Sequence, residues 1–361
     1  MWHARRLVVA VVVVLLAAGC TSTSGESSDK AGAVPAGKSV VLQMASTSWD
    51  LADVPPLEWF ARRVAALSSG NVQIDVTNNY GNYAPDAEAD LLHAVASGDI
   101  DLGWAGSRVF DTVGVPTFAP LSAPMLIDSY GLVDAVLRSN LTHEMLTGLS
   151  AIGVTGLALL GDELRLPIGV QHPLRAPADW RGLSIGTFRS DTQAAAIRAL
   201  GAEPVEAFGP YRSRDVQDGT IQGFELDVRR YVVQKWGRNA PYVTANVVLW
   251  PQFDVLFANP DTLSSLTAQQ RDWLAQAARD AALHSVGTAR DREQFVRQAC
   301  VSGAHFVTAT KADLRALRAA FAPVYRAIGR SRQQSTMLHE IEALKATTPH
   351  DSGLGIPRGC G

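Results

Sequence analysis

Short apolar runs alternate with amphipathic helical stretches along most of this chain, and this alternation constrains the fold more than any other feature. The first elements are a strand at 40–44, a helix at 55–67, a strand at 72–76, a helix at 87–96 and a strand that follows the turn at 98–99. This βαβαβ order predicts an α/β fold, with parallel strands and helices on both faces of the sheet.

The same alternation continues toward the C-terminus. Further strands are expected at 154–160, 164–170, 183–187, 205–207, 223–226, 246–250 and 255–258, and helices at 132–149, 192–200, 213–217, 228–236, 268–301, 311–328 and 334–346. The chain has 361 residues, which is enough for two domains of roughly 100–200 residues each. We therefore expect two α/β lobes crossed several times by the chain, with a binding cleft between them.

The first twenty residues have the pattern of a secretory signal peptide. Arg5 and Arg6 precede an apolar run of about a dozen residues, too short for a membrane span of roughly 20. The segment Ala17-Ala18-Gly19-Cys20 resembles a bacterial lipobox, which implies cleavage before Cys20 and acylation of that cysteine. An ordinary signal peptide with an incidental cysteine is the alternative. We expect a mature protein outside the cytoplasm, lipid-anchored to the outer face of the membrane, with residues 20–37 as a flexible tether.

Charge and motifs argue against several classes of function. The formal net charge is −3 and no basic stripe occurs, which argues against nucleic-acid binding. The eight histidines lack metal-ligand spacing, and neither H-E-x-x-H nor C-x-x-C occurs. Residues 32–39 match the P-loop pattern, but a tether precedes them and a strand follows, so nucleotide binding is not expected. No cofactor or metal is predicted, and an extracytoplasmic enzyme is the less favoured alternative.

Two cysteines remain besides Cys20. In an oxidising compartment Cys300 and Cys360 can pair and tie the C-terminal tail to the end of a helix. Two unlinked thiols are the alternative. We favour the disulfide because exposed free thiols outside the cell would be reactive.

Several segments between about residues 40 and 307 resemble the solute-binding proteins of TRAP transporters. They are Phe60-Ala61-Arg62-Arg63-Val64, Ser69-Gly70-Asn71-Val72-Gln73-Ile74, Ser97-Gly98-Asp99-Ile100-Asp101, Asp179-Trp180-Arg181-Gly182-Leu183-Ser184-Ile185, Leu200-Gly201-Ala202-Glu203-Pro204-Val205 and Asp218-Gly219-Thr220-Ile221-Gln222-Gly223-Phe224-Glu225. The resemblance implies a two-lobed periplasmic-binding-protein-like fold with parallel-rich sheets flanked by helices and a long helix that spans both lobes. It also implies capture of a small molecule, an organic acid, and its delivery to membrane permease subunits.

The expected domain organisation follows from this resemblance. A signal peptide occupies residues 1–19 and the tether residues 20–37. Lobe I is expected to comprise residues 38–162 and about 252–291, and lobe II residues 163–251 and about 292–361. A solute receptor for an ATP-driven importer or a signalling partner is the alternative function.

The resemblance also implies that arginines hold a ligand carboxylate with their planar forks. The family's signature arginine falls at Gly186 here. Arg189, three residues further on, is a candidate to replace it by folding back into the cleft, and an exposed arginine at the entry to a helix is the slightly favoured alternative. Arg165 and Arg108 match two further family arginines. The alternatives are a structural salt bridge of Arg165 with neighbouring acids (Glu163 or Asp162) and a role for Arg108 in holding its own loop.

Aromatic and acidic residues complete the expected site. Phe208 matches a family position whose aromatic side chain packs against the ligand, and Glu225 matches an acidic family position that lines the pocket. For both residues, ordinary core contacts are the alternative. Trp49, Trp104 and Trp250 lie at ends of elements that can face the cleft. Since apolar residues replace two polar family positions, Gly186 and Leu226, we expect a ligand larger or less charged than a simple dicarboxylate.

Overall fold

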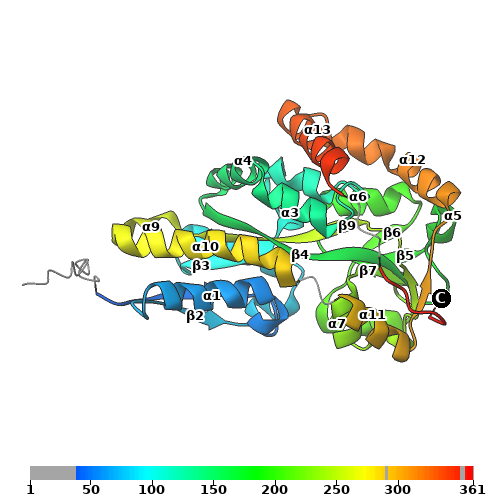
Figure 1. Ribbon diagram of the computed structural model, residues 1–361, viewed down its shortest axis with the longest axis horizontal. Coiled ribbons are helices and arrows are strands. Elements are labelled where there is room, and N and C mark those ends of the chain that lie inside the picture. The colour runs from blue at the N-terminus through cyan, green and yellow to red at the C-terminus, as the bar shows by residue number, and fades with distance from the viewer. Residues whose placement is uncertain (1–37, 289–291, 350–353, 361) are drawn as a thin grey trace, which may run out of the picture. The chain divides into compact units, whose positions relative to one another are not determined.

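One mixed sheet passes through the protein, with its strands in the order β2-β1-β3-β9-β4-β7-β5-β6 (Figure 1). The strands are β1 Val40–Ala45, β2 Val72–Thr77, β3 Leu102–Gly106, β4 Thr155–Gly169, β5 Ser184–Thr187, β6 Glu203–Glu206, β7 Gly223–Leu226, β8 Tyr242–Thr244, β9 Trp250–Ala258 and β10 His305–Val307. β8 pairs with β4 and with β10 outside this order.

The computed structural model describes residues 38–288, 292–349 and 354–360, all of which belong to the unit Gly37–Gly361. The expected signal peptide, lipobox and tether lie outside the described residues. Within them, no helix combines the length and apolar character that a bilayer span requires.

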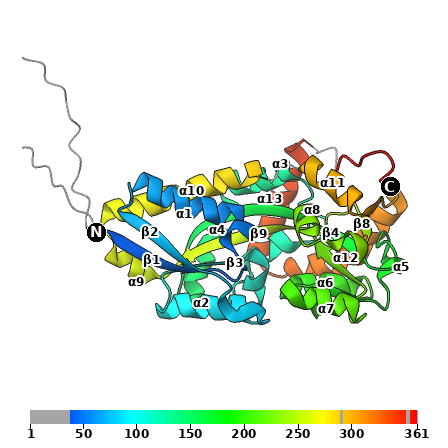
Figure 2. The ribbon, with the colours of Figure 1, turned by 90° about the horizontal axis from the view of Figure 1, so that it is seen from below.

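Parallel pairs occupy both ends of the strand order, and antiparallel pairs occupy its middle. β1 is parallel to β2 and β3, while β5 is parallel to β6 and β7. β9 runs antiparallel to β3 and β4, and β4 runs antiparallel to β7. The parallel βαβαβ unit predicted from the first five elements is therefore confirmed. Figure 2 shows β4 and β9 extending between the strands β1–β3 and the remaining strands.

β4 corrects the prediction of two separate strands at 154–160 and 164–170. Its 15 residues form one strand, paired with β9 along most of its length. The register shifts between Gly161 and Leu164. This irregularity accommodates the polar pair Asp162-Glu163, which the sequence pattern suggested as a break, without ending the strand.

Further expectations differ from the structure. The helical stretch expected at 132–149 is divided into helices at 130–138 and 141–147 and a 3₁₀ segment at 148–152. The strand expected at 246–250 is absent except for Trp250, where β9 begins, and β8 and β10 were not predicted. The single helix expected at 268–301 is described as two helices, and residues 289–291 between them lie outside the described residues. Strands of three residues such as β8 and β10 carry too little pattern to be recognised from sequence.

Helices cover the sheet. They are α1 Pro55–Leu67, α2 Ala87–Ser97, α3 Tyr130–Arg138, α4 Leu141–Thr147, α5 Pro177–Trp180, α6 Asp191–Ala199, α7 Gly209–Gln217, α8 Val228–Val233, α9 Pro260–Ser265, α10 Ala268–Thr288, α11 Arg292–Val301, α12 Lys311–Ile328 and α13 Arg332–Thr347. Short 3₁₀ segments are η1 Leu51–Asp53, η2 Tyr80–Tyr83, η3 Ser107–Val113, η4 Pro116–Ser122, η5 Gly148–Ile152 and η6 Trp236–Arg238.

Local sequence explains where these helices begin and which face they bury. α1 starts with two prolines, which are suited to a first turn that needs no N–H donors, and it buries Leu57, Phe60 and Val64 at a spacing of three to four residues. α12 begins with a capping box between Thr310 and Asp313. α10 packs against α1 and β4, as Figure 1 shows.

The Cys300 and Cys360 sulfurs are joined by a disulfide in the structure, with an S–S distance of 2.05 Å. The bond connects the C-terminal end of α11 to the tail, and Cys360 is buried with the core residues around β7 and β10. The Phe306 N–H of β10 also donates to the Cys360 carbonyl at 2.9 Å, so the tail lies along this strand.

Candidate functional site

A cavity of about 440 Å³ lies where the loops after β1 and β5 meet β3, β4, β9, α7 and α8. This volume falls in the range of roughly 300–1,000 Å³ typical of small-molecule sites. Its lining defines the arginine cavity, with polar residues Glu88, Arg108, Arg165, Arg212, Gln252 and Asp254 and aromatic residues Trp49, Tyr83, Trp104, Phe188 and Phe208 among others.

Three arginines from different elements are buried in this wall. Arg108 of η3, Arg165 of β4 and Arg212 of α7 are 6%, 3% and 2% exposed. Arg212 Nε donates to the Ala207 carbonyl at 3.0 Å, and no carboxylate of the described chain lies within 4.0 Å of its guanidinium. Burial lowers the pKa of Arg212 to about 10, so it remains a cation at neutral pH.

The other two arginines have partners that fix them. Arg108 Nη2 donates to Glu88 Oε2 at 2.6 Å, and Arg165 Nη2 donates to Gln252 Oε1 at 3.2 Å. Gly106 permits the position of Arg108, because a Cβ on Gly106 would lie 1.5 Å from Arg108 Nη1. The side chain therefore folds back over its own loop, and a larger residue at Gly106 would displace it.

Several nitrogens of these arginines have no hydrogen-bond partner. Within the described residues these are Nε and Nη1 of Arg108, Nε and Nη1 of Arg165, and Nη2 of Arg212, all of them buried. An unpaired buried donor costs about 1–3 kcal/mol, and more when it is charged. An anionic group among the three guanidiniums would provide the missing acceptors.

Phe188 lies between the three arginines, directly after β5. The Cζ atoms of Arg108, Arg165 and Arg212 are 4.3, 5.3 and 5.2 Å from the centroid of its ring. Phe208 stacks on Phe188 with 5.4 Å between centroids. The negative face of an aromatic ring attracts cations, so Phe188 helps to hold these like charges together.

Two carboxylates lie behind Arg165. Glu225 Oε2 is 3.7 Å from Arg165 Nε, and Asp227 Oδ2 is 3.7 Å from Arg165 Nη1. Burial raises the pKa of Glu225, against the opposing effect of the three arginines. Burial also acts to raise the pKa of Asp227, but Arg230, Arg165 and Arg229 outweigh it and lower that pKa to about 2.

Arg229 and Arg230 connect α8 to other parts of the chain. Arg230 donates to Asp162 in the irregular part of β4 and, through Nη1, to Asp227 at 2.9 Å. Arg229 Nη2 donates to the Asp53 carbonyl of η1 at 3.0 Å. These charges are thus engaged with protein partners, unlike that of Arg212.

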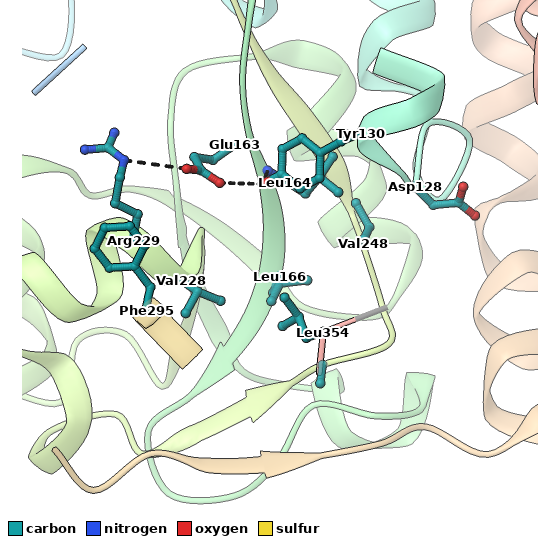
Figure 3. A pocket seen from close by; sticks show the side chains of 11 residues that line it. Asp128, Tyr130, Glu163, Leu164, Leu166, Val228, Arg229, Val248, Phe295 and Leu354 are labelled. Atoms are coloured by element: carbon teal, nitrogen blue, oxygen red, sulfur yellow. Dashed lines mark hydrogen bonds and ion pairs between the residues drawn. The ribbon is translucent and has the colours of Figure 1, made fainter. Parts of the chain in front are cut away.

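A second cavity lies beside this network (Figure 3). It measures about 50 Å³, far below the volume of a typical small-molecule site. The Tyr130 hydroxyl donates to Glu163, and Arg229 Nε lies 3.6 Å from the same carboxylate. Burial, with the nearby charges of Asp227 and Asp162, raises the pKa of Glu163 to about 7.

Arg189 takes a different position from the one expected for a ligand-binding residue. It lines a groove of about 560 Å³ near α6, not the arginine cavity. Its guanidinium pairs with Asp86 and lies 3.2 Å from Glu206, and these carboxylates hold it at the rim. Gly186 offers it no room, because a Cβ there would meet Ile221 Cδ1 at 2.8 Å.

The structure brings together most of the other expected residues. Phe208, Trp49 and Trp104 line the arginine cavity beside Arg108 and Arg165. Glu225 does not line it but contacts Arg165 from behind. Trp250 is 1% exposed and packs in the core. The Arg165 partners are Glu225 and Asp227, and not the neighbouring Asp162 and Glu163 that were the structural alternative.

Sequence reasoning missed Arg212, Phe188 and Asp254. The helix expected at 213–217 begins four residues earlier in the structure, at Gly209-Pro210, and so includes Arg212. Proline at the start of a helix was the available signal. Asp254 is a lone acid inside the fully buried strand β9, which is a recognisable anomaly.

Among the residues that the structure describes, no nucleophile elbow accompanies this cavity. The segment Gly182-Leu183-Ser184-Ile185-Gly186 matches the pattern G-x-S-x-G, but Ser184 is the first residue of β5 and not at a strand-to-helix turn. The described residues contain no cluster of three or more histidine, cysteine or acidic side chains that could hold a metal ion.

Residues 54–332 match the model of a protein family described as "Bacterial extracellular solute-binding protein, family 7". The chain belongs to this family. It is 24% identical over 294 residues to the C4-dicarboxylate-binding periplasmic protein DctP of Rhodobacter capsulatus. The aligned region covers 80% of this chain and 85% of that protein.

Solved structures of TRAP periplasmic solute-binding proteins share the fold. A TRAP periplasmic solute-binding protein from Ralstonia eutropha H16, with bound (S)-2-acetolactate, has a TM-score of 0.76 at 20% identity and covers 85% of this chain and 98% of its own. Another from Chromohalobacter salexigens, with bound D-glucuronate, has a TM-score of 0.74 at 18% identity and covers 84% and 99%.

The family 7 assignment confirms the resemblance to TRAP solute-binding proteins and the periplasmic-binding-protein-like fold. The protein is an extracytoplasmic solute-binding protein and not an enzyme.

Proposed function

We propose that the arginine cavity binds a small organic acid through its carboxylate. The observation that carries this proposal is the convergence of Arg108, Arg165 and Arg212, which are buried and have nitrogens without hydrogen-bond partners. The proposed direct ligand contacts are these three arginines, with Phe208, Trp49 and Trp104 as further wall residues. The acids bound by the two related structures and the dicarboxylate named for the R. capsulatus relative support this class of ligand.

The walls favour an acid with an apolar part. Phe188 and Phe208 stack on one side, and Trp104 and Trp49 lie elsewhere in the lining. Trp49 is 68% exposed, so it stands at the rim. Leu226 adds a further apolar wall residue. The ligand is thus larger or less charged than a simple dicarboxylate, for example an aromatic or branched acid.

A thermal-shift screen of the chain from Lys38 onward tests this function. The panel contains succinate, malate, D-glucuronate, phenyllactate, a branched-chain acid and neutral sugars. Binding raises the melting temperature by mass action, and a ligand at 100 times Kd adds about 2.7 kcal/mol of stability. We expect clear shifts with one or more carboxylates and none with neutral sugars. Tight binding of succinate or malate without preference for bulkier acids would contradict the proposed size of the ligand.

Capture is proposed to involve closure of two lobes. Lobe I comprises residues 38–162 and about 252–291, and lobe II residues 163–251 and about 292–361. Arg108 and Arg212 then belong to different lobes, and β4 and β9 connect the lobes next to the cavity. A ligand that contacts both arginines stabilises the closed form. The closed receptor delivers its ligand to the permease subunits of a TRAP transporter.

Cys20 is proposed as the site of lipid attachment, with residues 1–19 removed as the signal peptide. In the host, the protein is expected to label with palmitate and to sediment with membranes. The variant Cys20→Ser is expected to lose the label and to appear in the soluble extracytoplasmic fraction, while Cys300→Ser keeps the label. An unlabelled native protein would leave the ordinary signal peptide as the explanation.

A further inference from the structure

Asp254 is a buried acid without a cationic partner in the arginine cavity. It is 1% exposed and lines the cavity from β9. Gln252 Nε2 donates to its Oδ1 at 2.7 Å, while its Oδ2 has no hydrogen-bond partner among the described residues. Within the same residues, no arginine or lysine nitrogen lies within 4.0 Å of the carboxyl group. An ionised carboxylate in this position would be strongly destabilised.

Asp254 is connected to Arg165 through a single side chain. The Gln252 amide bridges the two side chains, because its Oε1 accepts from Arg165 Nη2 at 3.2 Å and its Nε2 donates to Asp254. A ligand carboxylate that contacts Arg165 is thus linked to Asp254 through the Gln252 amide. The free Oδ2 requires either a donor, if the group is ionised, or an acceptor, if it carries a proton.

We propose that Asp254 determines specificity as a neutral acid that donates a hydrogen bond to an oxygen atom next to the ligand's carboxylate. This inference rests on the proposed function. The substrate class is then a carboxylic acid with a hydroxyl or keto oxygen beside the carboxylate. An ionised Asp254 would instead repel the ligand's anionic group.

The charges that face Asp254 agree with a neutral acid. Burial is the main cause that raises its pKa to about 7, and the negative charge of Asp162 on β4 adds to it. The hydrogen bond from Gln252 and the positive charges of Arg230 on α8 and Arg108 on η3 act in the opposite direction but do not outweigh burial.

Asp254→Asn is the informative variant, because asparagine retains an acceptor for Gln252 and supplies a neutral donor at the position of Oδ2. The first readout needs no ligand. An acid with a raised folded-state pKa contributes stability that is present below its unfolded pKa and is lost as pH rises toward the folded pKa. From pH 4.5 to 6.5, the folding equilibrium constant of the native protein is therefore expected to fall about tenfold per pH unit relative to Asp254→Asn.

The second readout uses phenyllactate and 3-phenylpropanoate, which differ by a single hydroxyl oxygen next to the carboxylate. At pH 6, calorimetry is expected to give a Kd about fivefold lower for phenyllactate, since one hydrogen bond contributes about 1 kcal/mol. Above pH 7 the native Kd should rise about tenfold per pH unit as Asp254 ionises. In Asp254→Asn it should stay constant with pH, and in Asp254→Leu the preference for phenyllactate should vanish.

The outcomes separate this inference from the proposed function. A constant stability difference between native protein and Asp254→Asn from pH 4.5 to 6.5 would show an ionised Asp254 and overturn the inference. Equal Kd values for the two phenyl acids would contradict the proposed hydrogen bond from Asp254 to the ligand's hydroxyl or keto oxygen. Carboxylate binding would remain supported. If none of the acids in the panel binds the native protein, the proposed function fails and the ligand contact of Asp254 fails with it.

Discussion

Replacing Arg212 by glutamine is expected to weaken binding of a carboxylate by about 100-fold. Arg212 is the buried arginine of the cavity without a carboxylate of the described chain within 4.0 Å, so its charge is available to the ligand. Loss of a buried, charge-assisted interaction costs about 3 kcal/mol, which corresponds to about two orders of magnitude in Kd. Isothermal titration with an acid identified in the thermal-shift screen measures the change.

Arg214→Gln is the matched control on the same helix. Its side chain is 63% exposed and pairs weakly with Asp215 at 3.8 Å, away from the cavity. We expect the control to bind the acid like the native protein. Unfolding of Arg212→Gln is to be measured in parallel. Arg212→Lys should recover part of the affinity, because lysine restores the positive charge but lacks the planar guanidinium that can donate two hydrogen bonds to one carboxylate. An Arg212→Gln variant that folds and keeps native affinity would exclude this arginine from the ligand site.

The second large effect is expected in Asp227→Asn, which should lose about 3 kcal/mol of unfolding free energy at pH 7. Asp227 is 1% exposed and pairs with Arg230 at 2.9 Å and with Arg165 at 3.7 Å. Removal of its charge leaves two buried cations with fewer counter-charges, and breaking a buried pair costs about 3–5 kcal/mol. The lower end applies because asparagine can still cap α8, where Asp227 Oδ1 accepts from the Arg230 N–H at 2.7 Å.

The pH dependence of this loss has a defined sign. The folded-state pKa of Asp227 is lowered to about 2, from an ordinary value of 3.8. Its contribution is therefore present above about pH 4 and disappears as the pH falls through 2. Denaturant unfolding at several pH values should show the native protein and Asp227→Asn converging in this window. The exposed Asp218→Asn, at the end of α7, is the control and should change stability by less than about 0.5 kcal/mol. A gap between native and Asp227→Asn that stays constant down to pH 2 would contradict the assigned pKa shift.

Local patterns were sufficient for the elements that have strong periodicity. The helices at 55–67 and 311–328 have the predicted bounds, because prolines or a capping box mark their starts and their apolar spacing is regular. β4 was divided wrongly since Asp162 and Glu163 interrupt its apolar pattern. In the folded protein Arg229 pairs with Glu163 and Arg230 with Asp162, and partners 66 and 68 residues away are invisible to a local pattern.

The binding site could be predicted only in part, because local patterns do not show which distant residues pack together. Arg108 and Arg165 stood in recognisable segments, and the structure places both in the cavity. Arg189 is close in sequence to Gly186, yet Asp86 and Glu206 hold its side chain outside the cavity. Arg212 is 26 residues from Gly186, and only the packing of α7 against the end of β5 brings it to the cavity.

The sequence by itself determined the family, the alternation of strands and helices, and the residue types available for binding an acid. The tertiary structure decided which charges are compensated and which are available to a ligand. Arg230, Arg165 and Arg212 are chemically alike, but Asp162 and Asp227 engage Arg230, and Glu225 and Asp227 lie beside Arg165. Among the described residues, Arg212 has a backbone carbonyl as its hydrogen-bond acceptor and no carboxylate within 4.0 Å. Burial and distance set the electrostatic energy of each charge, and both quantities exist only once distant segments have packed together.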